Sequence, residues 1–148
     1  MSAQTSRKNA IIYPVRCQYA IRALIDLARL PIGQCVSAQQ LAYGNKAPSS
    51  FLSATLSRLV RNGILRSERG RGGGFALRLD PGTIRLSDVI DAIDTKSWYL
   101  CCAMGRSQCS DSNSCSMHEI WNSMRTSIVQ YLNTSIADLA KRNPTPAH

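Results

Sequence analysis

Hydrophobic residues recur at helical spacing through the first sixty positions of the chain. From Val15 to Leu30 they fall three and four residues apart, which predicts an amphipathic helix that ends in the turn 31–33. Ser37, followed three residues later by Gln40, has the pattern of a capping box. A short second helix is therefore expected directly after Ser37.

The same period predicts a third helix from about Pro48 to Arg61, which Asn62 and Gly63 would end. Its buried stripe is expected to contain Phe51, Leu52, Leu56, Leu59 and Val60. The opposite face carries small and polar residues, namely Ser50, Ser53, Ala54, Ser57 and Arg61. A short helix, a turn and a second helix with a polar outer face follow the helix-turn-helix plan.

Two short strands, 64–69 and 75–80, are predicted on either side of a glycine-rich segment. Four of the five residues from Gly70 to Gly74 are glycines, which permit positive φ angles and a loose hairpin tip. The hairpin also carries the arginines Arg66, Arg69, Arg71 and Arg78. A helix-turn-helix followed by a basic hairpin is a winged helix. No Lys-Ser or Lys-Thr follows the glycines, so a phosphate-binding loop is not indicated.

The second half predicts a further strand at 84–86 and a short helix at 88–93 that Ser87 would cap. Residues 95–115 are rich in Cys, Ser and Gly and are expected to form an ordered loop. A long helix should begin at Ser116, since apolar residues keep one face over sixteen positions. A helix of this length after a small domain usually packs on a partner, and 135–141 could form a final short helix.

These patterns predict a mainly α protein with a small β-wing, in which a winged helix-turn-helix domain is joined to a long dimerisation helix. The expected divisions are a DNA-binding domain at 1–94, a cysteine-rich sensor loop at 95–115, the dimerisation and C-terminal helices at 116–141, and a flexible tail at 142–148. The longest apolar runs are interrupted by charges, which excludes a membrane helix. No secretory segment is apparent, so the protein is expected in the cytoplasm.

Charge is distributed unevenly along the 148 residues, whose net charge is +9. Residues 1–79 contain 12 basic and 2 acidic residues, whereas residues 80–148 contain 6 basic and 7 acidic ones. A basic first half favours a polyanion such as double-stranded DNA as its partner, although a solubilising surface would also be basic. The expected DNA contacts are Ser49, Ser50, Ser53, Ser57, Arg58, Arg61, Arg69 and Arg71.

Four of the six cysteines fall within fifteen residues. The spacing Cys102-x6-Cys109-x5-Cys115-x2-His118 could complete an iron–sulfur or zinc site, because three thiolates and an imidazole are sufficient ligands. Cys101 could replace Cys102 as the first ligand or act as a resolving thiol. A thiol switch and a purely structural loop remain open alternatives. A thiol oxidoreductase is disfavoured by the missing Cys-x-x-Cys, and no catalytic set is evident, so no enzyme is predicted.

The sequence resembles the Rrf-two-type bacterial transcriptional regulators, a family that includes the regulators IscR, NsrR and RirA. The resemblance covers about residues 12–140. It rests on Tyr19-Ala20-Ile21-Arg22-Ala23-Leu24, Leu41-Ala42, Phe51-Leu52, Leu56-x2-Leu59, Asn62-Gly63-Ile64-Leu65 and Ser67-x-Arg69-Gly70-x-Gly72-Gly73-Gly74-Phe75-x-Leu77.

This resemblance implies a homodimer that pairs through the long helix and binds palindromic operators, and we expect the protein to act as a repressor. The implied dimer contacts are Ile120, Trp121, Met124, Ile128 and Tyr131. It further implies that Cys102, Cys109, Cys115 and His118 hold a [2Fe-2S] or [4Fe-4S] cluster that reports iron–sulfur, redox or nitric oxide status. By position, Ser50 and Ser53 match recognition-helix contacts and Arg69 matches a residue that enters the minor groove.

The chain departs from the family pattern at three places. The first cysteine gap has six residues, where the best-known cluster-binding members have five, and Cys101 lies beside the first ligand. Gln18 stands where some relatives supply an acidic ligand, which favours His118. Ser53 replaces an acidic residue with which IscR discriminates its sites, so that operator cannot be transferred to this chain.

Overall fold

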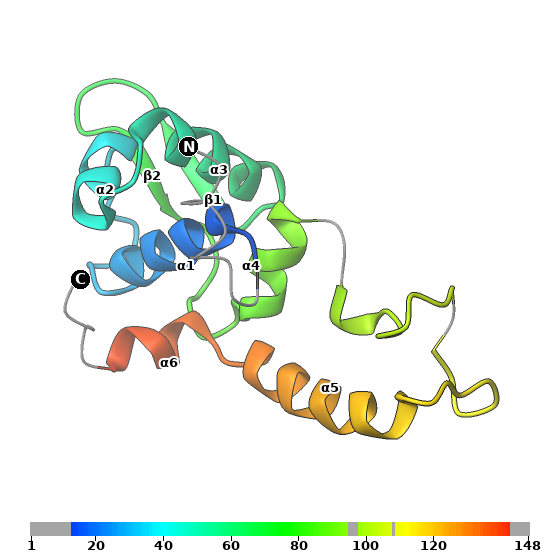
Figure 1. Ribbon diagram of the computed structural model, residues 1–148. Coiled ribbons are helices and arrows are strands. Elements are labelled where there is room, and N and C mark those ends of the chain that lie inside the picture. Colours follow the sequence, from blue (N-terminus) through cyan, green and yellow to red (C-terminus); the bar gives the residue numbers. More distant parts are fainter. Residues whose placement is uncertain (1–12, 95–97, 108, 143–148) are drawn as a thin grey trace.

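The computed structural model describes residues 13–94, 98–107 and 109–142, and shows a helical body from which one long helix projects (Figure 1). The elements in chain order are α1 (Val15–Ala28), α2 (Ala38–Asn45), α3 (Ser49–Arg61), β1 (Leu65–Glu68), β2 (Gly74–Leu77), α4 (Leu86–Ile93), the 3-10 turn η1 (Trp98–Leu100), α5 (His118–Leu132) and α6 (Ile136–Lys141). The predicted fold class, mainly helical with a small wing, is confirmed. No helix in these residues is both long and apolar enough to cross a bilayer.

Helix α1 lies at the centre of the body and packs against α2, α3, α4, α6 and β2 (Figure 1). Its small and aliphatic residues let these neighbours approach from several sides, and the buried ones are Cys17, Ala20, Ile21, Ala23, Leu24 and Leu27. Leu52, Leu56 and Leu59 of α3 are fully buried in the same core. The predicted stripe of α3 therefore faces α1, except that Phe51 lies 38% exposed at its edge.

The helix-turn-helix forms as the sequence predicts. The Ser37 hydroxyl accepts a hydrogen bond from the Gln40 backbone N–H at 3.1 Å, while Gln40 Oε1 accepts one from the Ser37 N–H at 3.2 Å. This capping box starts α2. Lys46 then adopts the left-handed conformation, with φ of 52°, and turns the chain into α3. The turn leaves the polar side of α3 exposed.

The wing is an antiparallel pair of strands in which Leu65 lies opposite Leu77. Both strands are shorter than predicted, since β1 covers Leu65–Glu68 and β2 covers Gly74–Leu77. Val36 joins the hairpin through two backbone hydrogen bonds with Phe75, of 2.9 and 2.8 Å. Gly74 permits this approach, since a Cβ there would lie only 2.3 Å from the Val36 carbonyl oxygen.

Three sequence-based predictions about the second half are wrong in detail. Residues 84–86 form no strand, because Arg85 makes an isolated bridge with Ser135 and Leu86 already begins α4. The cap of α4 is Arg85 instead of Ser87, since its backbone N–H donates to Asp88 Oδ2 at 2.9 Å. The long helix begins at His118, two residues after Ser116. The loop before it contains η1.

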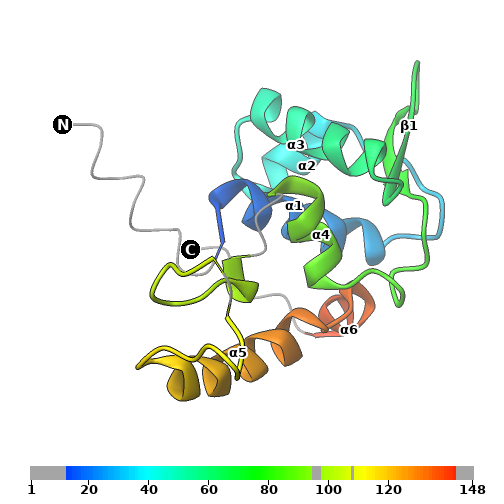
Figure 2. The same ribbon diagram turned by 90° about the vertical axis from the view of Figure 1, so that its right-hand side faces the viewer.

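Helix α5 is attached to the body at its C-terminal end. The Ile136 N–H donates to the Ile84 carbonyl at 2.9 Å, and the Arg85 guanidinium donates to the Asn133 carbonyl at 2.6 Å. The short final helix expected at 135–141 forms as α6, and the Ser135 hydroxyl caps it by accepting a hydrogen bond from the Asp138 N–H. Figures 1 and 2 both place α5 at the opposite end of the molecule from the wing. The cysteine loop and the wing are thus well separated.

Candidate cysteine-loop site and DNA interface

The four predicted ligands gather where the loop meets the first turns of α5. Cys102 Sγ lies 3.8 Å from Cys115 Sγ, and Cys109 Sγ lies 3.5 Å from His118 Nδ1. The four residues are separated by up to sixteen positions of sequence, and the fold brings them together as two contacting pairs. Each pair joins one residue from the early or middle loop to one at or near the start of α5.

The loop buries Cys102 and exposes Cys101. Cys102 is only 7% exposed, and its sulfur contacts the sulfur of Cys115. Cys101 is exposed, and its carbonyl accepts a 2.8 Å hydrogen bond from the Trp121 indole N–H. Of the two candidates for the first ligand, Cys102 is therefore the one whose sulfur lies among the other donors.

The loop backbone stabilises the thiolate form of Cys102. Backbone N–H groups of Arg106, and next of Met104, donate hydrogen bonds that lower the pKa of the Cys102 thiol. Burial opposes this effect, whereas contact with Cys115 and the Arg106 charge reinforce it. Thiolates are both the metal-binding and the nucleophilic form of cysteine, so this environment prepares Cys102 for either chemistry.

His118 is held from behind by a carboxylate. The imidazole is buried, and its Nε2 lies 2.8 Å from Asp111 Oδ1 and 3.3 Å from Asn122 Nδ2. A proton on Nε2 that bonds to Asp111 leaves the Nδ1 lone pair directed at Cys109. A histidine ligand usually has such an outer partner. Asp111 was not predicted from the sequence, where a carboxylate seven residues before His118 was the available signal.

Arg125 approaches the site from α5, seven residues or about two turns after His118. Its Nη2 donates to Cys109 Sγ at 3.0 Å and its Nη1 donates to Asn122 Oδ1 at 3.2 Å. The guanidinium also lies over the Trp121 ring, 5.8 Å from the centroid. Within the described ranges, its Nε is the buried side-chain nitrogen or oxygen for which no hydrogen-bond partner is found. Sequence reasoning missed Arg125, because only the folded loop brings it to Cys109.

The donor set fits an iron–sulfur cluster or zinc in its chemistry. Three sulfurs and an imidazole are the right ligand types, Asp111 supports the histidine, and a buried Nε–H lacks the acceptor that a bound group could supply. Among residues 13–94, 98–107 and 109–142, however, no three His, Cys, Asp or Glu side chains are grouped closely enough to hold a metal ion. Binding would therefore require the two pairs to move together.

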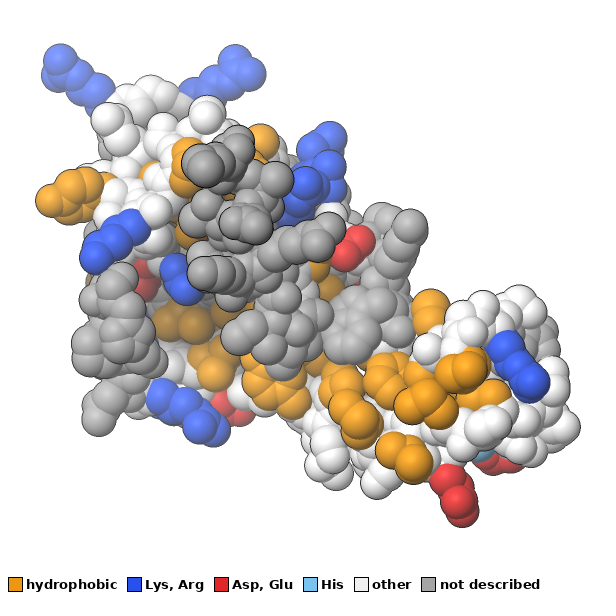
Figure 3. Space-filling view, viewed as in Figure 1, with side chains coloured by type: hydrophobic (Ala, Val, Ile, Leu, Met, Phe, Trp, Pro, Cys, Tyr) orange, Lys and Arg blue, Asp and Glu red, His pale blue; other side chains and the backbone are white. Residues whose placement is uncertain are grey.

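The candidate DNA contacts lie at the other end of the molecule. Ser49, Ser50 and Ser57 are exposed on α3, Ser53 is half-buried, and Arg61 is exposed at the helix end. Arg69 and Arg71 are exposed at the wing tip, and Figure 3 shows basic side chains projecting from this end. These residues make a polar and basic surface on two neighbouring elements.

Two arginines near this surface have structural partners. Arg58 Nη1 donates to the Ile93 carbonyl at 2.8 Å and so closes the end of α4. Arg66 pairs with Glu68 and donates to the Gly33 carbonyl at 2.9 Å. The structure therefore gives Arg58, a predicted DNA contact, a second task that its sequence position did not reveal.

The outer face of α5 is apolar and largely exposed, as Figure 3 shows. Ile120 is 64% exposed and Met124 is 54% exposed, and Met117 and Tyr131 are exposed beside them. The other two predicted dimer contacts are partly buried within the chain itself: Trp121 packs on the loop, and Ile128 packs against the core. The exposed stripe is thus Met117, Ile120, Met124 and Tyr131.

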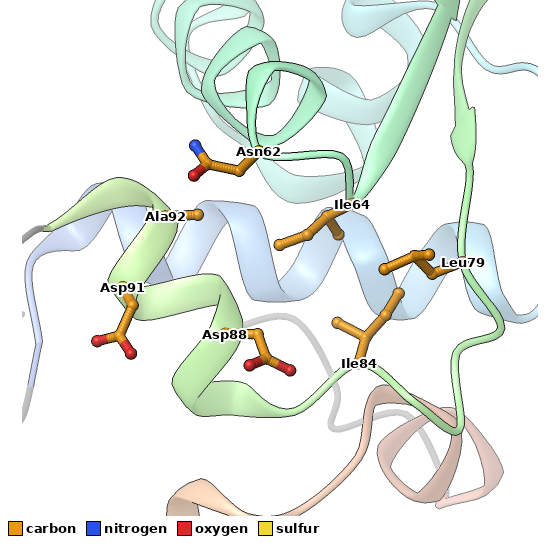
Figure 4. A pocket seen from close by; sticks show the side chains of 7 residues that line it. All are labelled: Asn62, Ile64, Leu79, Ile84, Asp88, Asp91 and Ala92. Atoms are coloured by element: carbon orange, nitrogen blue, oxygen red, sulfur yellow. The ribbon is translucent and has the colours of Figure 1, made fainter.

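A groove of about 420 Å³ lies between the end of α3, the base of the wing and α4 (Figure 4). It is lined by Asn62, Ile64, Leu79, Ile84, Asp88, Asp91 and Ala92. Asp88 already accepts the Arg85 N–H. This lining contains no cysteine or histidine, so the groove is distinct from the cysteine-loop site.

Comparison with known proteins identifies the family to which this combination of fold and loop belongs. The Rrf2 family, described as "Iron-dependent Transcriptional regulator", matches residues 14–142. The chain belongs to the Rrf2 family. Over 116 residues it is 30% identical to the transcriptional regulator IscR of Citrobacter koseri, a match that covers 78% of this chain and 71% of the relative.

Solved Rrf2-type structures have the same fold. CymR of Bacillus subtilis, described as the global cysteine regulator, superposes with a TM-score of 0.74 at 21% identity, over 90% of this chain and 99% of that one. IscR of T. potens superposes with a TM-score of 0.69 at 20% identity, over 91% and 94%. The expected resemblance is confirmed, and this Rrf2 chain is a DNA-binding transcriptional regulator.

Proposed function

We propose that this Rrf2 regulator is a dimeric repressor whose cysteine loop binds an iron–sulfur cluster through Cys102, Cys109, Cys115 and His118. The observation that carries the proposal is the gathering of these four side chains into two contacting pairs at the start of α5. The family description as iron-dependent regulators agrees with this choice of metal.

The proposed DNA contact uses the two basic elements opposite α5. The α3 face with Ser49, Ser50, Ser53 and Ser57 enters the major groove, and Arg69 and Arg71 on the wing reach the minor groove or backbone. Hydroxyl groups discriminate bases weakly, so phosphate contacts and groove shape supply much of the affinity. Arg61 adds a phosphate contact, and Arg58 does so only if it releases the Ile93 carbonyl.

A second copy of the chain is the proposed occupant of the α5 stripe. Met117, Ile120, Met124 and Tyr131 repeat at helical spacing on one side, and exposed apolar stripes of this kind mark helix–helix interfaces. Two-fold pairing would present two recognition helices to a palindromic operator. Met117, the first residue of the stripe, lies two positions after the proposed ligand Cys115, so the stripe starts where the loop ends.

A bound cluster would supply a centre that gains or loses an electron and that oxygen or nitric oxide can attack. The chain's own residues then have distinct tasks. Backbone N–H groups of the loop favour the thiolate form of Cys102, and Asp111 orients His118. Because Cys115 and His118 lie at the start of α5, drawing the four side chains together or apart would change how the loop packs on this helix, which is the proposed route to a changed DNA affinity.

Anaerobic purification followed by iron and sulfide analysis and visible absorbance tests the cofactor. The expected result is a coloured protein with iron and acid-labile sulfide, and loss of both in Cys109→Ala. Cys35→Ala is the matched control, since this half-buried thiol lies outside the loop. A colourless protein that takes up only zinc, or no metal after reconstitution, would contradict the cluster.

A thiol switch is the second candidate, and the 3.8 Å separation of Cys102 and Cys115 sulfurs favours it. Hydrogen peroxide would oxidise the two thiols to a disulfide, with both protons and both electrons passing to peroxide to form two waters. Metal-free protein treated with peroxide should then lose two reactive thiols and change its operator affinity, and Cys115→Ser should do neither. An unchanged thiol count would exclude the switch.

A further inference from the structure

We propose that Arg125 is the positioning residue of the cysteine loop, where it holds the Cys109 sulfur by an N–H···S hydrogen bond and raises the reduction potential of the bound group. This inference rests on the proposed cluster. Arg125 Nη2 lies 3.0 Å from Cys109 Sγ, which is sixteen residues away in the sequence. The same Nη2 lies 3.5 Å from the Cys101 carbonyl oxygen, so one guanidinium contacts the loop at two points.

The arrangement of α5 shows that this contact is part of a face. Residues 118, 121, 122 and 125 recur at steps of three, one and three, and each contacts the loop or a neighbour that does. Ile120 and Met124 lie on the other side, in the exposed stripe. Arg125 therefore belongs to the sensor side of the helix, next to His118.

A purely structural role leaves part of the guanidinium unexplained. Stacking on Trp121 and the bond to Asn122 would fix the side chain in place without any approach to sulfur. The Nε–H is nevertheless buried, and in the described chain no acceptor is found for it. Buried N–H groups rarely stay unpaired, and a sulfur that arrives with a bound group is an acceptor of the required kind.

The direction in which Arg125 should change the reduction potential follows from its charge. Reduction adds negative charge to a cluster, and a fixed positive charge with N–H donors stabilises the reduced form. Arg125 should therefore raise the potential. Arginine suits this task because its planar group donates to several acceptors at once, which a lysine ammonium on the same turn could do only in part.

The test compares the reconstituted full-length protein with Arg125→Met, Arg125→Lys and Arg106→Met. Arg106 is the charge-matched comparison, because its charge also favours the Cys102 thiolate while its side chain bonds to Asn113 Oδ1 at 3.2 Å, on the exposed side of the loop. At the wild-type midpoint potential, Arg125→Met should lower the ratio of reduced to oxidised cluster about tenfold, which is 59 mV for one electron. Arg125→Lys should fall between, and Arg106→Met should shift less.

Thermal melting of the metal-free variants separates this role from simple support of the fold. The proposal expects the potential to change while the Arg125→Met and Arg106→Met melting temperatures stay close together. Failure of Arg125→Met to retain a cluster that both Arg106→Met and Arg125→Lys retain also supports it. Equal potentials in Arg125→Met and Arg106→Met overturn the role of Arg125 alone, whereas a wild-type protein without a cluster overturns it together with the proposed function.

Discussion

The hydroxyl groups of Tyr13 and Tyr131 lie 3.1 Å apart and form a hydrogen bond between the start of α1 and the far half of α5. Burial and then this hydrogen bond raise the pKa of Tyr13. The contact joins the helical body to the proposed dimerisation helix, 118 residues away in sequence. It therefore helps to fix the orientation of α5 relative to the body.

Replacing Tyr131 by Phe should destabilise the protein by about 0.5–1.5 kcal/mol, because the change removes one hydrogen bond and leaves the ring. Urea unfolding measures the loss. Tyr43→Phe is the control, since Tyr43 is 90% exposed on α2 and should unfold like wild type. Equal unfolding curves for the two variants would mean that the Tyr13 contact contributes no stability.

Gly74→Ala should damage the wing more than its small size suggests. The residue has φ of 142°, and a Cβ would lie 2.3 Å from the Val36 carbonyl, so the Val36–Phe75 bridge must open. We expect a clear fall in melting temperature and weaker operator binding. Gly44→Ala is the counterpart, because an added Cβ there meets open space and should stabilise α2 by about 0.5–1 kcal/mol. Similar effects from both substitutions would contradict this description of the wing.

Arg69→Ala should weaken operator binding by about 1–3 kcal/mol, measured by fluorescence anisotropy at several salt concentrations. Arg69 is exposed at the wing tip, while Arg66, three residues earlier, is paired with Glu68 and bonds to the Gly33 carbonyl. Arg66→Ala therefore serves as a charge-matched control with a smaller expected effect on DNA affinity. If Arg66→Ala costs more affinity than Arg69→Ala, the wing does not meet DNA through its tip.

Ile120→Glu should convert a dimer into monomers, because it buries a carboxylate in the middle of the apolar stripe. Sedimentation equilibrium gives the mass directly. Gln130→Glu adds the same charge to an exposed position of α5 outside the stripe and should leave the mass unchanged. A wild-type protein that sediments as a monomer at all concentrations would remove the stripe as an interface.

Cys17 should resist thiol reagents in the folded protein. It is fully buried in α1, and burial, followed by the Asp94 charge, raises the pKa of its thiol to about 11 against the opposing charge of Arg16. The raised value means that neutral Cys17 stabilises the fold below the unfolded pKa of about 8.5, and this contribution is lost as pH rises from there toward 11.

The measurement is the difference in free energy of unfolding between wild type and Cys17→Ala from pH 7 to 10.5. The wild-type advantage should shrink above about pH 8.5, since the two chains differ only in the thiolate that position 17 gains when the wild-type protein unfolds. Labelling at pH 8 provides a second readout, in which exposed Cys101 reacts rapidly and Cys17 reacts only after unfolding. Rapid labelling of Cys17 would show that α1 opens readily.

Local signals predicted the winged helix well. The apolar period of α1 and the capping box of Ser37 and Gln40 each act within a few residues, so they can be read from the chain. The cap of α4 could not be predicted from local signals in the sequence. Ser87 is the better capping residue by type, but bonds of residues 84–86 to 134–136 fix the backbone earlier and make Arg85 the cap.

The ligand candidates were also predicted from residue type and spacing, whereas their partners were not. Asp111 supports His118 only because the loop turns back over α5, and Arg125 reaches Cys109 for the same reason. Arg58 looked like a phosphate contact until the fold placed it at the Ile93 carbonyl. Such contacts depend on tertiary structure, and the periodicity of a sequence does not contain them.

The one-ended attachment of α5 has a mechanical consequence. The helix is fifteen residues long, about 22 Å, and is anchored near Asn133 while the cysteine loop sits at its free end. It can therefore act as a lever: a tilt of about 5° at the anchor displaces the far end by roughly 2 Å, within the range of helix shifts that switch other proteins. In the proposed dimer, a change at the loop would act at this far end, where it has the greatest effect on the tilt of α5 and so on the spacing of the two recognition helices.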